Sequence, residues 1–158
     1  MRITGFPPFF NEDSEILILG SFPSVKSREE GFYYGNKQNR FWRALAKALN
    51  KSVPKSVEEK KELLASSKIA IWDIVTECEI KGSSDESIKN AKVADLNMIL
   101  NRAKIKRILL NGLTAYKYFI KYYPRLKDIS YLLPSTSPRN AKFKEETFIE
   151  IINKAIKE

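Results

Sequence analysis

Residues 16–24 read ILILGSFPS. Four consecutive apolar residues that stop at a glycine are typical of a central strand in a parallel sheet, where both faces are covered. Gly20 permits a sharp turn or a close approach of the backbone, and Pro23 fixes the chain soon after. A strand that ends in two hydroxyls, an aromatic ring and a fixed turn indicates a loop that does more than connect two elements.

Apolar runs of the same kind recur along the chain, and amphipathic segments separate them. We expect further strands at 68–72, 105–110 and 129–133, and helices at about 39–50, 56–66, 95–103, 114–123 and along the C-terminal region. Strands that alternate with helices predict a parallel sheet between helical layers. The expected fold class is therefore α/β, a three-layer α/β/α sandwich with a central, mostly parallel four-stranded sheet. Residues 1–14 are expected to lie extended over the core, and residues 78–90 to form a polar loop.

Length and charge limit the number of domains and the kinds of partner that the chain can have. The chain has 158 residues, which suits one domain, and we expect residues 1–158 to form it. Lys and Arg number 28 against 19 acidic residues, and the net charge of +9 favours a polyanionic partner such as nucleic acid. A basic surface that only keeps the protein in solution is the alternative. No apolar run is long enough to span a bilayer, so we expect no membrane segment. Residues 1–15 lack a charged region followed by a long apolar core, so we expect no secretion signal, and we expect a cytoplasmic location.

Two residue counts exclude whole classes of chemistry. The chain has no histidine, which removes Ser-His-Asp and Cys-His catalysis and the usual histidine-containing zinc sites. Cys78 is the single cysteine, which excludes an internal disulfide framework and a four-cysteine iron–sulfur cluster. We therefore expect no metal and no cofactor. An enzyme of this composition has to use carboxylates, amides, hydroxyls, lysines and backbone dipoles.

Polar segments follow each expected strand. They are residues 20–24, 73–77, 111–114 and 135–140. Ligands in open α/β sheets bind at the carboxyl ends of the strands, which lie along one edge. The sequence therefore predicts a polar binding site at that edge of the sheet.

Three stretches together resemble the uracil-DNA glycosylase superfamily, and within it the hypoxanthine-DNA (DNA-deoxyinosine) glycosylase branch. The stretches read GSFPSVKS…FYYGNKQNRFW (residues 20–42), WDIVTECEIKGSSDESIKN (residues 72–90) and LPSTSPRNA (residues 133–141). The order and spacing of several uncommon motifs is more specific than any one of them. The resemblance implies hydrolysis of the N-glycosidic bond of a damaged base in DNA, by a monofunctional and monomeric enzyme. It also implies base flipping, because a base inside a duplex cannot be reached.

Two residues are candidates for catalysis. In the hypoxanthine-specific branch the active-site asparagine lies in an Asn-Arg-Phe-Trp motif, which Asn39 matches. An amide contributes by positioning and electrostatics rather than as a base. A helix cap is the alternative for Asn39. Asp73 lies where uracil-reading relatives place a base-pairing asparagine; it could accept the N1–H of hypoxanthine, stabilise a cationic sugar or orient water. An anchor for the following loop is the alternative for Asp73.

The resemblance also implies a pocket that stacks on the flipped base. Phe22 is the candidate platform, and Gly20 and Pro23 hold it in place. Tyr33 and Tyr34 are candidates for the same wall of the base pocket. Ordinary core packing is the alternative for Phe22, and we expect it for at least one of the two tyrosines.

Hydroxyls near prolines are suited to bind DNA phosphates. The candidates are Ser21, Ser24, Ser135, Thr136 and Ser137. Ordinary turn and cap chemistry is the alternative. The wedge that fills the hole left by a flipped base is expected to be Arg139, with a simple phosphate contact as the alternative.

Two departures from better-known branches favour hypoxanthine over uracil. Phe22 stands where many uracil-DNA glycosylases carry Asp or Asn, and Ser135 stands where many carry His. The leading hypothesis is release of hypoxanthine from deaminated DNA. The alternatives are a uracil- or mismatch-specific DNA glycosylase, and a non-catalytic nucleic-acid-binding α/β domain.

Overall fold

Four parallel strands form the centre of the protein. The computed structural model describes residues 1–158. The sheet has the order β3-β2-β6-β7, with β2 at Ile16–Gly20, β3 at Ile69–Asp73, β6 at Arg107–Asn111 and β7 at Ser130–Leu133. Every pairing in this sheet is parallel. The four strands expected from the sequence are therefore confirmed.

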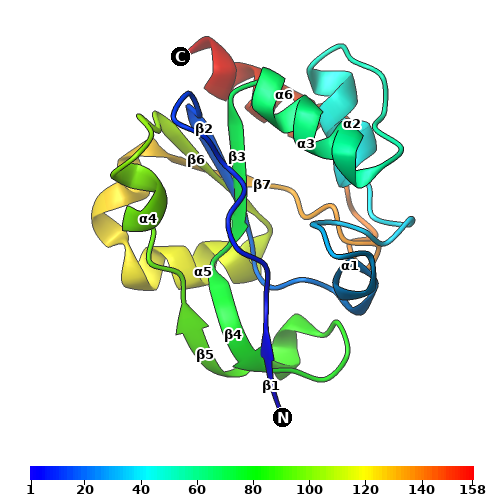
Figure 1. Cartoon of the computed structure of the whole chain (residues 1–158), viewed down its shortest axis with the longest axis vertical. Coiled ribbons are helices and arrows are strands. Elements are labelled where there is room, and N and C mark those ends of the chain that lie inside the picture. Colours follow the sequence, from blue (N-terminus) through cyan, green and yellow to red (C-terminus); the bar gives the residue numbers. More distant parts are fainter.

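Helices cover both faces of this sheet (Figure 1). One layer holds α2 (Phe41–Ala48), α3 (Val57–Ser66) and α6 (Glu145–Lys157), and the other holds α4 (Asn97–Leu100) and α5 (Leu113–Tyr122). The α/β/α sandwich is the expected fold class. None of these helices is long and apolar enough to cross a membrane.

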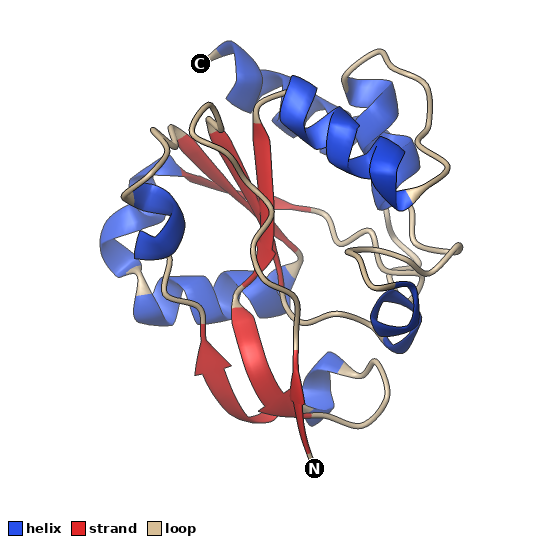
Figure 2. Ribbon diagram, viewed as in Figure 1, coloured by secondary structure: helices blue, strands red, loops and turns tan.

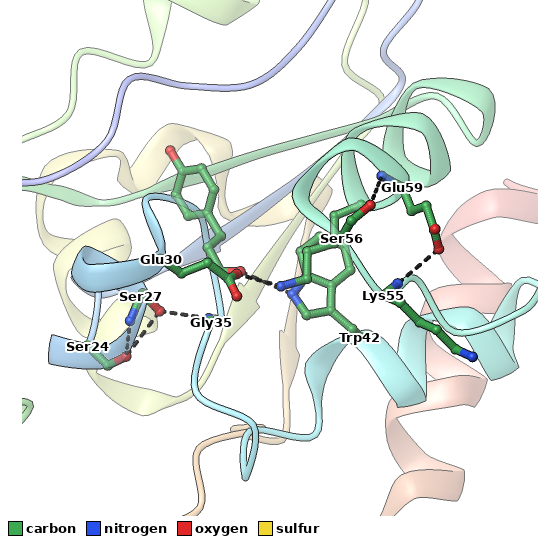
Figure 3. A network of polar contacts seen from close by, with 10 residues as sticks. Ser24, Ser27, Glu30, Gly35, Trp42, Lys55, Ser56 and Glu59 are labelled. Atoms are coloured by element: carbon green, nitrogen blue, oxygen red, sulfur yellow. Dashed lines mark hydrogen bonds and ion pairs between the residues drawn. The ribbon is translucent and has the colours of Figure 1, made fainter.

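The core explains why the elements form where they do. All five residues of β2 and of β3 are buried, which the unbroken apolar runs in the sequence require. The helices α2 and α5 each bury apolar side chains, which are Phe41 and Leu45 of α2 and Phe119 of α5. Ser56 begins α3 as expected, because its Oγ accepts a hydrogen bond from the Glu59 amide at 3.1 Å (Figure 3).

A second, smaller sheet was not expected from the sequence. It is antiparallel, with the order β1-β4-β5, and its strands are Arg2–Thr4, Val75–Glu79 and Lys89–Val93 (Figure 2). The prediction of a polar loop over residues 78–90 was therefore wrong at both ends, although a 3-10 turn at Asp85–Ser87 lies between them. The irregular pairing of β4 with β5 removes the clean alternation that reveals a strand in the sequence.

The N-terminal segment lies extended over the core, as expected. Phe9 and Ile71 exchange backbone hydrogen bonds of 3.0 and 2.9 Å, which cover the outer edge of β3. The Trp72 indole also donates to the Phe6 carbonyl at 3.1 Å. An edge strand protected in this way is not free to pair with another chain.

Candidate active site

A cavity of about 450 Å³ opens at the carboxyl ends of the parallel strands. All the residues that the sequence singled out for the site line it. They are Gly20, Ser21, Phe22, Ser24, Tyr33, Tyr34, Asn39, Asp73, Ser135, Thr136, Ser137 and Arg139. Segments as distant as residues 20 and 140 thus meet in one place, as the strand-end argument predicted.

Gly20 lies between two polar groups on the wall of this cavity. A Cβ atom at Gly20 would lie 2.6 Å from Asp73 Oδ1 and 2.7 Å from the Tyr34 hydroxyl. Any side chain at this position would collide with both. Glycine is therefore needed here for the close approach of the two groups rather than for an unusual backbone angle.

Asp73 and Tyr34 have a further property in common. Oδ2 of Asp73 and the hydroxyl oxygen of Tyr34 are the two buried side-chain polar atoms that find no hydrogen-bond partner in the protein. Such atoms cost free energy unless a ligand or solvent satisfies them. Tyr34 is held in place by its left-handed backbone (φ 53°) and by stacking on Phe41, with ring centroids 4.1 Å apart. The Tyr34 ring is therefore held in place beside the cavity.

Burial controls the protonation of both groups. Loss of solvent raises the pKa of Asp73 to about 8, and the nearby charge of Asp85 adds to the effect. Burial, and then the charge of Asp73, also raise the pKa of Tyr34 well above its usual range. At neutral pH both groups therefore carry their protons and can donate hydrogen bonds.

This protonation makes stability depend on pH. Because the pKa of Asp73 rises from 3.8 to about 8 on folding, the folded state holds one more proton than the unfolded state between these values. The Asp73 contribution is greatest below pH 3.8 and is lost progressively as the pH rises to about 8. Asp73→Asn should remove this loss, so the Tm of the variant relative to wild type should rise with pH across that window. A difference in Tm that stays constant across the window would contradict the assignment.

Asn39 uses only one end of its amide within the protein. Its Oδ1 accepts a hydrogen bond from the Phe41 amide at 2.9 Å, at the start of α2. The capping contact that the sequence allowed is thus present, although Arg40 rather than Asn39 is the residue that precedes the helix. The amide Nδ2 remains available to donate into the cavity.

Other expected phosphate ligands are already engaged. Ser21 donates to Asp85 Oδ1 at 2.9 Å. The Ser24 hydroxyl caps the helix α1 (Val25–Glu30): it accepts from the Ser27 amide at 3.1 Å and donates to Ser27 Oγ at 3.0 Å (Figure 3). Thr136 is fully buried, and its hydroxyl accepts from Asn111 Nδ2 at 3.0 Å. The hydroxyls of Ser21 and Ser24 thus donate within the protein, and the Thr136 hydroxyl is out of reach of a phosphate because the residue is fully buried.

The remaining two hydroxyls are free to donate. Ser135 Oγ accepts from the Ser137 amide at 3.3 Å, and Ser137 Oγ accepts from the Arg139 amide at 3.2 Å. Each hydroxyl has its own proton left over. Ser135 and Ser137 are therefore the hydroxyls of the final loop that suit an anionic ligand.

The two remaining candidates for the base pocket, Tyr33 and Phe22, are both largely buried. Tyr33 is a core residue: it is 2% exposed, its hydroxyl donates to the Pro7 carbonyl at 2.7 Å, and its ring packs edge-on against Phe6. It supports the wall from behind, and the expectation that one tyrosine of the pair belongs to the core is met. Phe22 is also largely buried, and the Arg28 guanidinium lies 5.8 Å from its ring centroid.

The residues that line the cavity include several that were not assigned to the site from the sequence, and two of these are Asn111 and Asn36. Asn111 ends β6 and makes two hydrogen bonds with Thr136. Its Oδ1 accepts from the Thr136 amide at 3.2 Å, and its Nδ2 donates to the Thr136 hydroxyl at 3.0 Å. Asn36 also lines the cavity. Asn111 could have been found, because it directly follows a buried strand at the expected edge; Asn36 lies in a turn that carries no such signal. No group of acidic or cysteine side chains suited to a metal ion is present.

This fold is shared by a class of DNA glycosylases. The family profile of the uracil DNA glycosylase superfamily matches residues 7–157, and the chain belongs to this superfamily. A hypoxanthine DNA glycosylase of Methanosarcina acetivorans is 35% identical over 144 residues, which is 88% of this chain and 89% of that protein. One of Methanosarcina barkeri is 32% identical over 147 residues, 90% of each chain.

A solved structure has the same fold as this chain. The solution NMR structure of a protein from M. acetivorans, provisionally described as a uracil DNA glycosylase, matches with a TM-score of 0.83. The two chains are 30% identical, and the match covers 100% of both. The chain thus resembles proteins with two different substrate names, and the choice between them depends on the site.

Proposed function

We propose that this chain is a monofunctional DNA glycosylase that flips deoxyinosine out of DNA and releases hypoxanthine. The hypoxanthine DNA glycosylases of Methanosarcina support the substrate. The observation that carries the proposal is the pair of buried, unpartnered polar atoms of Asp73 and Tyr34 on the cavity wall. A site that leaves such atoms unpaired is built for a polar ligand.

Hydrogen-bond chemistry matches this pair to a deaminated base. Deamination of adenine replaces an amino group by a carbonyl and gives the adjacent nitrogen a proton. The Tyr34 hydroxyl and the neutral Asp73 carboxyl can donate to that carbonyl, and the other oxygen of Asp73 can accept the ring N–H. Adenine brings an amino donor instead, so the Tyr34 hydroxyl would have to accept rather than donate, and its own proton would be left without a partner. The site therefore favours the deaminated base over its parent.

The same groups help the base to leave. When the C1′–N9 bond breaks, its electron pair goes to the base, and part of the charge collects on the carbonyl oxygen. Donors aimed at this oxygen stabilise the charge in the transition state. Water adds to C1′ and loses a proton, and the base gains one. Nδ2 of Asn39 is placed to donate to the base or to hold the water.

The outer parts of the site serve to grip the DNA. Ser135 and Ser137 bind the phosphates beside the flipped nucleotide, and Phe22 stacks on its base. Arg139 fills the gap in the duplex; its side chain is 60% exposed, and its one ion pair, to Glu86, is 4.0 Å long. A contact of this length at the surface is weak enough to give way to DNA. The enzyme acts as a monomer on DNA that contains a deaminated base.

Incubation with duplexes that each contain one deoxyinosine or one deoxyuridine tests the function. Alkaline cleavage of the product reveals the abasic site. We expect cleavage at inosine, and little at uracil, because Phe22 and Ser135 stand where many uracil-DNA glycosylases carry Asp or Asn and His. An unmodified duplex of the same sequence is the control.

The other outcomes each assign a different function. Cleavage at uracil with none at inosine would assign the chain to the uracil-releasing alternative. Salt-dependent binding of both duplexes without cleavage would assign it to the non-catalytic class.

A further inference from the structure

Arg40 joins the Asn39 turn to the final loop of the site. Its guanidinium donates to three backbone carbonyls of that loop: Nε to Thr136 at 3.4 Å, and Nη2 to Asn140 at 2.8 Å and to Ser137. The Arg40 amide also donates to the Thr136 carbonyl at 3.1 Å. The same guanidinium lies over the Phe143 ring, 4.6 Å from its centroid.

The contacts of Arg40 connect two parts of the candidate active site. Arg40 directly follows Asn39, whose Nδ2 is free to donate into the cavity. The carbonyls that Arg40 binds flank Arg139 and the hydroxyls of Ser135 and Ser137. Arg40 is therefore the side chain that ties the group next to the base to the groups that grip the DNA.

We propose that Arg40 is a positioning residue that fixes the wedge and phosphate-binding loop in register with Asn39. It touches neither base nor phosphate, and it acts through residues 136–140. A guanidinium is suited to this task because its donors form a rigid planar fork that can bind several carbonyls and stack on a ring at once. A lysine keeps the charge but offers neither the fork nor the stacking face. The inference rests on the proposed glycosylase function.

Arg40→Lys tests this, with Arg43→Lys as the matched control. Arg43 lies in α2, which begins directly after Arg40; it is exposed and has no hydrogen bond or ion pair through its side chain. We expect Arg40→Lys to lower the single-turnover rate on an inosine duplex at least about tenfold, since small misplacements of catalytic groups are costly. The control should stay within about twofold, as expected for a surface change. Equal rates for the two variants would overturn the proposal.

A double-mutant comparison with Arg139 distinguishes a positioning role of Arg40 from a general loss of protein stability. The measured quantity is the affinity for a duplex that already contains an abasic site. This affinity can be measured without catalysis, so the test remains valid if the proposed reaction is wrong. Arg139→Ala should weaken this affinity in the wild-type background and have a clearly smaller effect in the Arg40→Lys background, because Arg40 acts through the same loop. Purely additive effects would overturn the proposal.

A second variant covers the case in which Arg40→Lys does not fold. Phe143→Leu removes the ring beneath the guanidinium and leaves its carbonyl partners in place. It should show the same loss of coupling to Arg139, to a smaller extent. Full, undiminished sensitivity to Arg139→Ala in this background would overturn the proposal as well.

Discussion

Asp73→Ala should lower the single-turnover rate of hypoxanthine release by about 10²- to 10³-fold, the usual cost of removing one preorganised donor to a developing oxyanion. The physical reason is the neutral, buried carboxyl, which lines the cavity and whose Oδ2 has no hydrogen-bond partner in the protein. The rate constant at saturating enzyme, on a duplex with one deoxyinosine, measures the effect. Binding of an undamaged duplex should be nearly unchanged, because the carboxyl lies below the surface.

The pH dependence of the rate identifies the active form. With a pKa of about 8, Asp73 loses its proton above that pH, so the wild-type rate should fall there. Asp73→Asn keeps a donor that does not titrate, and this fall should be absent from its profile. The charge of Asp85 helps to raise the pKa, so Asp85→Asn should move the fall to lower pH. A wild-type rate that rises through pH 8 would mean that the carboxylate is the active form.

Asn39→Asp should lower the rate by about 10²-fold or more while stability is kept. The aspartate retains the oxygen that accepts from the Phe41 amide, so the start of α2 stays capped. What it loses is the Nδ2 donor. Single-turnover kinetics and a thermal melt of the same sample separate the two roles.

Asn39→Ala is the matched comparison. It removes both the donor and the cap, so it should lose the same activity and also cost about 1 kcal/mol of stability. DNA binding should persist in both variants. Unchanged turnover in Asn39→Asp would remove the donor from the mechanism, and a faster rate would show that this residue acts on the water.

The sheet and the location of the site could be predicted from the sequence, for one physical reason. Buried parallel strands require unbroken apolar runs, and their carboxyl ends must lie along one edge. The sequence alone therefore predicts that the polar residues after each run, such as Asp73 and Ser135, converge.

Contacts made at long range could not be predicted. The partners of Arg40 are carbonyl groups, which every residue carries, so nothing in the sequence marks the loop that it binds. The burial of Thr136 depends on Asn111, which lies 25 positions away. The division between Tyr33 in the core and Tyr34 at the cavity depends on the left-handed turn at Tyr34. Two adjacent tyrosines do not reveal such a turn.

The direct passage of β3 into β4 places Asp73 at the junction of the two sheets. Asp73 is paired in register with Gly20, and the next two amides donate to the carbonyls of Gly20 at 2.8 Å and Ser21 at 3.0 Å. The Ile74 carbonyl then accepts from the amide of Ala94, the residue directly after β5 of the second sheet, at 2.8 Å. Local opening of a protein begins where such ties are few. Asp73 therefore belongs to a part of the molecule that should loosen late on heating.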